Sequence, residues 1–365
     1  MNDRDLFLLL ASSNDCYYGK SLINKLYKKT LDLKKILNLD IENDLKQEEI
    51  FKLKKLKETI QTINLEKIQN ELIENDVRFV ALCDEAYPVS LRMISDSSYG
   101  LFYKGNLSVL KNTKSVGIVG TRNPTNYGIN NAKDIASLLA EYKVNIISGF
   151  ASGIDTSAHV GALKKGKTVA VLGTGVDVIF PKENKDLYER LIKEDNLIIS
   201  EYYPGITGSP WNFPQRNRII SALSDAVLVI EGGLQSGALI TARFAIKYGK
   251  PLFALPGPID SPASNGPNIL IKSGVAELLT SVDEILEKIG ENKQIKLGLK
   301  MEDEKLNNLS ENEKIVYKLL SSKSYDFDIL VQETKFNVQE LLKCLSMLEL
   351  KGFIEKTQEG GYVRN

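Results

Sequence analysis

The sequence is poor in the residues that build disulfide frameworks and many metal sites. Its 365 residues include three cysteines, at positions 16, 83 and 344, and a single histidine, at position 159. The cysteines are far apart and form no CxxC pair, so a disulfide framework is not expected and a reducing cytoplasm is the expected location. We also expect neither a metal nor a cofactor.

Long apolar runs and net charge are also missing. No run approaches the roughly 18 apolar residues of a membrane helix, and the N-terminal apolar patch is too short and too acidic at its flank for a signal peptide. The 47 basic residues are balanced by 47 acidic ones. A broad polyanion-binding surface is therefore disfavoured, and any nucleic-acid site must be a local patch.

What the sequence does contain suggests several segments. Residues 1–75 alternate apolar and charged residues at helical spacing, and Gly19 is the only glycine before Gly100. This pattern predicts a small helical domain over 1–75, of the SAM or helix-hairpin-helix type. Its lysines are interleaved with acids and are expected to form a solvated face.

A different pattern begins at Ser115. Short β-branched runs, most of them ending in glycine, alternate with helical patterns, which predicts a doubly wound, mainly parallel α/β sheet within 76–287. Such sheets bind ligands beyond the carboxyl ends of their strands. The predicted strands are SVGIVG (115–120), VNIISG (144–149), TVAVLG (168–173), NLIIS (196–200), DAVLVIEGG (225–233) and KPLFALPG (250–257).

The C-terminal part looks like a separate module. Residues 288–308 lose periodicity and are expected to be a linker, after which 309–365 predict three helices and a short hairpin, the pattern of a winged helix. This module has nine acidic and eight basic residues. Its would-be recognition helix is nearly neutral, so we expect a packing, regulatory or protein-contact role rather than duplex reading.

Two features that suggest catalysis are better explained otherwise. Residues 161–168, GALKKGKT, fit the P-loop formula, but a helix precedes them and a strand follows, which reverses the geometry of a P-loop. Asp155 and His159 are four residues apart on a predicted helix with no nucleophile fixed beside them. We expect Asp155 to cap the helix and pair with His159, a structural role.

Several turns after predicted strands are candidate anion sites. Arg122 follows the first strand, Lys182 follows a turn after the third, and the Ser236–Gly237 loop leads from EGG into a clear helix, where free amides favour a phosphate. The plain alternatives are a solvated arginine, an exposed loop lysine, and a tight turn that needs glycine.

The stretch WNFPQRNRII, 211–220, combines rings and guanidiniums. Pro214 suits a first helical turn, where cations such as Arg216 and Arg218 are disfavoured unless an anion lies near. Phe213 offers a flat face for base stacking, which favours a single strand over a duplex groove. The alternatives are solvated or internally paired arginines and, for Trp211, a core or interface position.

Taken together, these blocks resemble those of the DNA-processing protein A (DprA/Smf) family, in order from about Ala86 to Ala276. The most specific block is NFPQRNRII. The flanking helical region and the winged helix are similar to modules present in many members. Gly232–Gly233 and Gly266–Pro267 depart from the common pattern of that family, and the first departure is expected to affect the shape of the pocket.

The resemblance implies an extended Rossmann-like fold for 76–287. It also implies a protein that is not an enzyme, binds and protects incoming single-stranded DNA, dimerises through its Rossmann domain and loads the RecA recombinase in natural transformation. No catalytic residue is expected. The single-stranded-DNA-binding residues that it implies are Arg122, Lys182, Phe213, Arg216, Asn217, Arg218, Ser236 and Gly237.

Two other functions remain open at this point. A nucleotide-processing enzyme resembling Rossmann-like phosphoribohydrolases would use the EGG–SG loop for phosphate and Glu231 as acid or base. A transcription regulator would use the winged helix, although the near-neutral charge of its recognition helix weakens this hypothesis.

Overall fold

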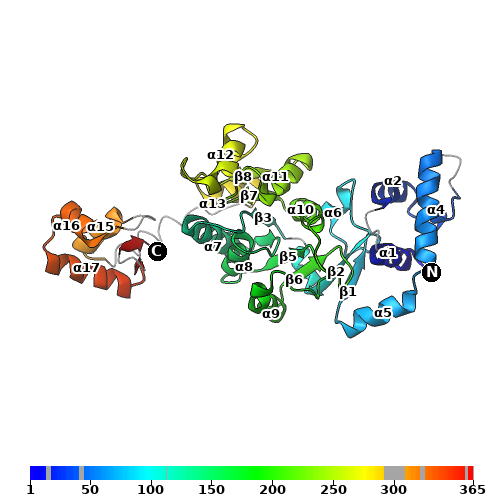
Figure 1. The fold of residues 1–365 in the computed structure, drawn as a ribbon, viewed down its shortest axis with the longest axis horizontal. Coiled ribbons are helices and arrows are strands. Elements are labelled where there is room, and N and C mark those ends of the chain that lie inside the picture. Colours follow the sequence, from blue (N-terminus) through cyan, green and yellow to red (C-terminus); the bar gives the residue numbers. More distant parts are fainter. Residues whose placement is uncertain are drawn as a thin grey trace. The chain divides into compact units, whose positions relative to one another are not determined.

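The structure, a computed structural model, describes residues 1–13, 18–40, 45–111, 113–291, 309–320, 325–357 and 361–364. They belong to two compact units, Met1–Glu291 and Asn292–Asn365 (Figure 1). Most of the predicted linker falls on 292–308, outside the described residues, and the predicted domain boundaries stay predictions. Within the described ranges, no helix combines the length and apolarity that crossing a bilayer requires.

Among the described residues of the first unit, nine strands form one sheet in the order β1-β2-β6-β5-β4-β3-β7-β8-β9. The pairs from β6 through β9 are parallel, whereas β1–β2 and β2–β6 are antiparallel. The mainly parallel α/β sheet is confirmed. The strands are β1 (Arg78–Ala81), β2 (Gly100–Gly105), β3 (Ser115–Val119), β4 (Asn145–Ser148), β5 (Thr168–Leu172), β6 (Leu197–Ser200), β7 (Ala226–Val229), β8 (Leu252–Ala254) and β9 (Glu277–Leu278).

The strand order reverses between β3 and β7. From β3 the chain adds β4, β5 and β6 on one side, then returns to place β7 on the other side of β3. At such a switch point the loops at the carboxyl ends diverge and leave a crevice. The residues after β3 and β7 therefore flank the expected ligand site.

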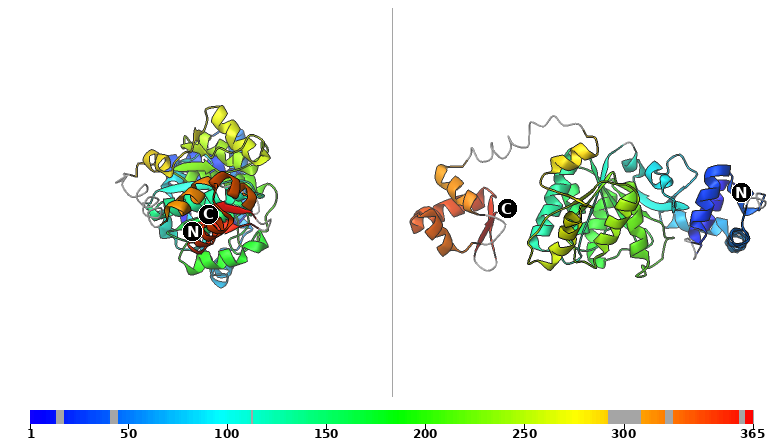
Figure 2. Two further views of the ribbon diagram at one scale, coloured as in Figure 1. Left: turned by 90° about the vertical axis from the view of Figure 1, so that its left-hand side faces the viewer. Right: turned by 90° about the horizontal axis from the view of Figure 1, so that it is seen from above.

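Helices cover both faces of this sheet (Figure 2). On one face of the sheet, α7, α8 and α13 pack against side chains of β3 and β7 in one buried cluster. On the other face, α10 and α11 contribute to a second buried cluster. The predicted buried residues of α10, Ile219, Ile220 and Leu223, are at most 5% exposed. The helices after β3 are α7 (Asn126–Glu141), α8 (Ile154–Ala162), α9 (Lys185–Lys193), α10 (Asn212–Leu223), α11 (Gly237–Lys247), α12 (Asn265–Lys272) and α13 (Val282–Lys288).

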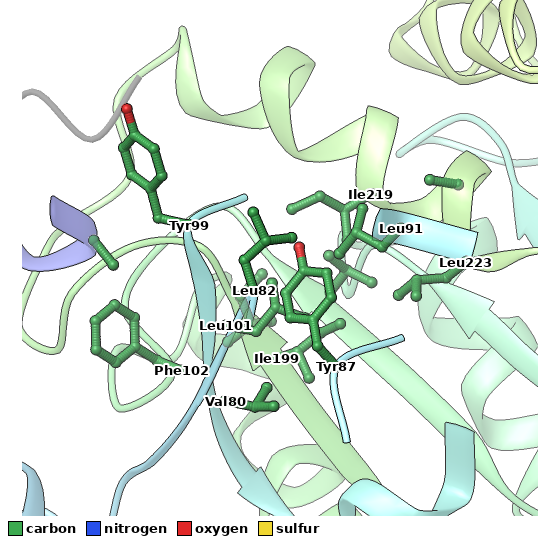
Figure 3. Packing of buried hydrophobic residues seen from close by; sticks show 14 of the residues in the cluster. Val80, Leu82, Tyr87, Leu91, Tyr99, Leu101, Phe102, Ile199, Ile219 and Leu223 are labelled. Atoms are coloured by element: carbon green, nitrogen blue, oxygen red, sulfur yellow. The ribbon is translucent and has the colours of Figure 1, made fainter. Parts of the chain in front are cut away.

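The N-terminal helices join the same core as the sheet. Phe7 on the first helix is fully buried, with its ring centroid 6.3 Å from that of Tyr99, and the cluster continues through Phe102 to Ile219 (Figure 3). The predicted helical character of this region is confirmed. Its helices are α1 (Asp3–Ser12), α2 (Lys20–Thr30), α3 (Leu33–Leu37), α4 (Gln47–Gln61) and α5 (Leu65–Glu74), and α6 (Val89–Met93) lies between β1 and β2.

The second unit has the predicted winged-helix elements and its own apolar core. Three helices precede an antiparallel hairpin, and Leu330, Leu341 and Leu348 are fully buried in that core. Asn337 begins the third helix with a capping box to Glu340, which satisfies two backbone donors. The elements are α15 (Glu311–Leu319), α16 (Phe327–Thr334), α17 (Val338–Leu350), β10 (Ile354–Lys356) and β11 (Tyr362–Arg364).

Candidate functional site

A pocket of about 630 Å³ opens at the carboxyl ends of the central strands. Its lining comes from the loops after β3, β4, β5 and β7 and from the first turns of α10 and α11. This is the crevice that the reversal of strand order predicts. The pocket brings together six of the eight predicted site residues, namely Arg122, Phe213, Arg216, Asn217, Ser236 and Gly237.

Arg122 and Phe213 meet at this pocket. The exposed Arg122 guanidinium lies 5.5 Å from the centroid of the Phe213 ring, within cation–π distance. Phe213 is half-buried and its ring centroid is 5.5 Å from that of Phe180, which is 48% exposed. The ring rests on backbone, because a Cβ on Gly173 would come within 2.8 Å of it. An exposed cation and a half-buried aromatic ring thus lie side by side at the pocket.

Arg216 lines the pocket from a buried position. It is 4% exposed and donates hydrogen bonds from Nη1 to the carbonyls of Gly149 and Val171 and from Nε to Asn217 Oδ1 at 3.1 Å. Burial lowers the pKa of Arg216 to about 10, and burial raises the pKa of the neighbouring Asp155 carboxyl. The guanidinium is therefore held in place by the protein before any ligand arrives.

Gly149 makes this arrangement possible. A Cβ at that position would lie 2.6 Å from Arg216 Nη2 and 2.6 Å from Asp155 Oδ2. A glycine is therefore required after β4, because the Arg216 and Asp155 side chains approach the backbone there too closely for a Cβ. The spacing of residues in the sequence did not reveal this role.

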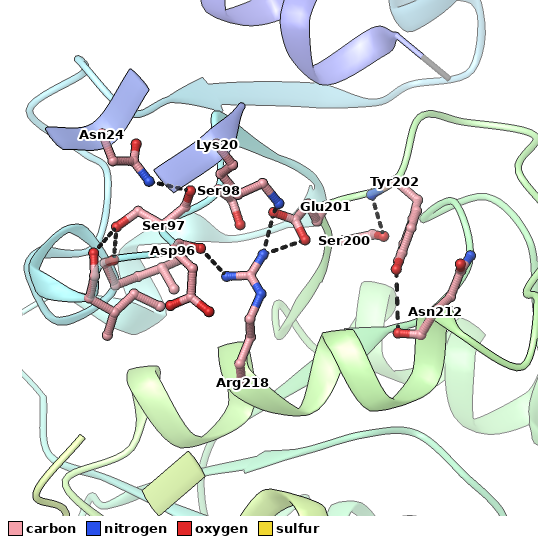
Figure 4. Close-up of polar contacts among 12 residues, drawn as sticks. Lys20, Asn24, Asp96, Ser97, Ser98, Ser200, Glu201, Tyr202, Asn212 and Arg218 are labelled. Carbon is pink, nitrogen blue, oxygen red and sulfur yellow. Dashed lines mark hydrogen bonds and ion pairs between the residues drawn. The ribbon is translucent and has the colours of Figure 1, made fainter. Parts of the chain in front are cut away.

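Arg218 does not line the pocket, contrary to the sequence-based prediction. It is 1% exposed, its Nη2 lies 2.5 Å from both Glu201 carboxylate oxygens, and its Nη1 donates to the Asp96 carbonyl at 2.6 Å (Figure 4). Lys20 from α2 binds the same carboxylate. Arg218 therefore contributes to a buried ion cluster of Lys20, Glu201 and Arg218, the Glu201 cluster, and is not available to a pocket ligand.

The Glu201 carboxylate stays ionised in this cluster. Burial alone would raise the pKa of Glu201, but the charges of Arg218 and Lys20 outweigh it and lower this pKa to about 2. Glu201 follows β6, and its two partners come from α2 and α10. Lys20 and Arg218, almost 200 positions apart, thus bind the same carboxylate. This contact connects the N-terminal helices to the sheet.

The Ser236–Gly237 turn completes the pocket beside Asn217. Asn217 donates from Nδ2 to the Gly237 carbonyl at 3.1 Å, which joins the first turns of α10 and α11. Ser236 Oγ is buried and has no hydrogen-bond partner among the described residues. The first amides of α11 also have no partner within their own helix, so this turn can donate to an anion.

The glycine pair after β7 has a packing explanation. A Cβ on Gly232 would lie 2.4 Å from Ser236 Oγ. The amide of Gly266 donates to the Gly232 carbonyl at 2.7 Å, and a Cβ on Gly266 would approach that oxygen to 2.4 Å. Both departures from the family pattern thus lie in one close contact between this loop and the start of α12.

Lys182 lies outside the pocket lining in the described structure. It is exposed in a short 3₁₀ turn, Lys182–Asn184, two residues beyond Phe180, which does line the pocket. Its assignment to the binding site stays a prediction. Phe180 itself was missed by sequence reasoning, although its place just before Pro181 in the turn after the third predicted strand could have marked it.

Two residues considered for catalysis have structural contacts. His159 is fully buried and its Nδ1 lies 2.7 Å from Thr168 Oγ1, so the expected pairing with Asp155 is wrong, and burial lowers the pKa of His159 to about 3. Glu231, 2% exposed, accepts from the Thr125 amide at 2.9 Å and from the Thr125 hydroxyl at 2.5 Å. Glu231 thus fixes the loop after β3 and lies outside the pocket lining in the described residues.

Comparison with known proteins places this architecture in a family. The family model of DNA recombination-mediator protein A matches residues 78–290, and that of the DprA winged helix domain matches residues 302–360. Protein Smf of Escherichia coli is 37% identical over 308 residues, covering 82% of this chain and 79% of Smf.

Two solved structures are also similar. DNA processing protein A from Streptococcus pneumoniae has a TM-score of 0.66 at 33% identity, covering 79% of this chain and 98% of that one. DNA processing protein A from Helicobacter pylori, described for its single-stranded DNA binding mode, has a TM-score of 0.53 at 32% identity, covering 58% and 95%. This chain belongs to the DNA recombination-mediator protein A family.

Proposed function

We propose that the pocket at the carboxyl ends of the sheet binds single-stranded DNA and that the protein is a recombination mediator, not an enzyme. The observation that carries the proposal is the exposed Arg122 guanidinium lying 5.5 Å from the centroid of the Phe213 ring, where both residues line the pocket at the strand-order reversal. A phosphate would bind Arg122, and an unpaired base would stack on Phe213.

The remaining pocket residues support the same ligand. The first turn of α11 and the buried Ser236 hydroxyl offer donors for a second phosphate. The buried Arg216 guanidinium contributes a positive charge to the pocket lining. The Asp155 carboxyl lies beside it and interacts with that charge. Bases of an unpaired strand can reach such a recess, whereas paired bases in a duplex are stacked inside it.

The nucleotide-processing alternative is weakened by its own candidate residue. Glu231 is bound to Thr125 and does not face the pocket in the described structure. The carboxyl that does line the pocket, Asp155, lies beside Arg216 and accepts from the Ala151 amide at 3.3 Å. These contacts suit a carboxylate that positions Arg216 rather than one that transfers a proton to substrate.

The proposed partners are a second copy of this chain and a RecA-type recombinase. Exposed apolar side chains lie on α11, on α12, just before β9 and on β9, and they offer apolar surface for a homodimer through this domain. They are Ile246, Ile269, Val275 and Leu278. Loading a recombinase on incoming DNA in natural transformation would place this activity in the cytoplasm.

A binding titration tests the proposal. The full chain should bind a labelled dT oligomer, an unlabelled single strand should compete better than a duplex, and a mononucleotide should bind weakly and without turnover. Arg122→Ala should weaken oligomer binding about tenfold, the scale of one charged contact. Arg190→Ala, which removes an exposed arginine on α9, is the matched control. Tight mononucleotide binding with turnover would instead support the enzyme.

A further inference from the structure

Trp211 is unusual among the aromatic residues of this protein. It is the only tryptophan in the chain and is 82% exposed, although tryptophan is on average a highly buried residue. A core position for Trp211 is therefore wrong. An isolated aromatic ring in water has no folding role that explains it.

The position of Trp211 connects it with the pocket. It is the residue that precedes α10, and its neighbours Pro210, Phe213 and Pro214 all line the pocket. Phe180, with 48% of its surface exposed, lies on the same lining. Trp211 is thus exposed and next in the chain to residues that line the pocket, without being part of that lining itself.

The backbone that carries Trp211 is well fixed. The backbone carbonyl of Asn212 accepts a hydrogen bond from the Tyr202 hydroxyl at 3.3 Å. Its side-chain amide accepts from the Ser209 hydroxyl at 2.8 Å and donates to the Gly173 carbonyl at 3.2 Å. The ring is therefore presented to solvent from an anchored segment. A large flat side chain held in this way loses little further backbone entropy when a ligand covers it.

We propose that Trp211 is a second base-stacking platform, outside the pocket, for the nucleotide that follows the one bound at Phe213. This inference rests on the proposed function and extends it: the bound strand continues across the rim past the first turn of α10. Stacking tolerates any base because every base has a flat face, so the contact would add affinity without sequence preference.

The single tryptophan makes the test direct, because fluorescence excited at the red edge, where tryptophan absorbs and the 15 tyrosines do not, reports on Trp211 alone. A dT oligomer should quench this fluorescence as it binds, whereas a thymidine mononucleotide, which occupies the pocket only, should not. Trp211→Ala should lower oligomer affinity about 5- to 150-fold, the range for one stacked base, and Trp211→Phe should lower it less.

Phe51→Ala is the matched control, since Phe51 is 67% exposed on α4, away from the pocket lining; its affinity should be unchanged. Unquenched fluorescence during Arg122-dependent binding, or wild-type affinity in Trp211→Ala, would overturn the inference alone. A fluorescence shift with protein concentration in the absence of DNA would assign the ring to self-association and also overturn it. Failure of the wild-type chain to bind the oligomer would overturn the proposed function as well.

Discussion

Two arginines of α10 that are two residues apart have different environments. Arg216 lines the pocket at the carboxyl ends of the strands, whereas Arg218 is sealed into the Glu201 cluster beneath the N-terminal helices. At the pocket, Arg122 and Phe180 are exposed, whereas the Glu201 cluster pairs two buried cations with one buried carboxylate. The same residue type therefore lines a pocket on one side of the helix and holds the fold together on the other.

The largest expected effect comes from breaking the Glu201 cluster. Glu201→Ala leaves Lys20 and Arg218 buried without this carboxylate, which should lower the free energy of unfolding by about 3–5 kcal/mol. Urea unfolding of the variant measures the loss. The exposed pair Arg190–Glu194 is the comparison, and Glu194→Ala should cost less than about 1 kcal/mol. Equal losses in the two variants would contradict a structural role for the cluster.

A smaller effect should appear as a pH dependence of stability. Burial lowers the pKa of His159 to about 3 from its ordinary 6.5. Folding thus favours the neutral imidazole of His159. Its contribution to the unfolding free energy is complete above pH 6.5, and this contribution falls by up to about 1.4 kcal/mol per pH unit as the pH decreases towards 3. His159→Gln should flatten the curve of unfolding free energy against pH between 6.5 and 4.5, above the range in which Glu201 titrates. An unchanged curve would show that the histidine does not titrate in this way.

The smallest effect expected is that of Glu231→Gln. The amide side chain keeps its shape but loses the charge that strengthens both hydrogen bonds from Thr125, so the unfolding free energy should fall by about 1 kcal/mol. Thermal unfolding checks the value. Thr125→Val also removes the hydroxyl that caps α7 by accepting from the Gly128 amide at 3.2 Å, so it should cost more. A much larger loss of binding than of stability in Glu231→Gln would point to direct contact with ligand.

The central strands could be predicted because they are buried on both faces. Apolar runs ending in glycine marked β3, β4, β5 and β7, and their carboxyl ends correctly located the pocket. The short antiparallel strands β1 and β2 carry no such continuous signal and were not identified individually.

The misassignment of Arg218 was avoidable in part. At 100° per residue, positions 216 and 218 of a helix point about 200° apart, so the two side chains leave nearly opposite sides of α10. Its partners, in contrast, could not be found from the sequence, because Glu201 and Lys20 are brought to it only by the tertiary fold. The buried roles of Gly149 and Gly232 likewise depend on side chains that approach from other elements.

The salt dependence of single-strand binding tests the central claim most directly. If the Arg122 guanidinium holds a phosphate, Arg122→Ala should reduce the slope of log affinity against log salt by about 0.7, the value for one phosphate of a single strand, and leave the unfolding free energy unchanged. Arg190→Ala should keep the wild-type slope. Identical slopes for the wild type and Arg122→Ala would contradict a DNA-binding pocket built around this arginine.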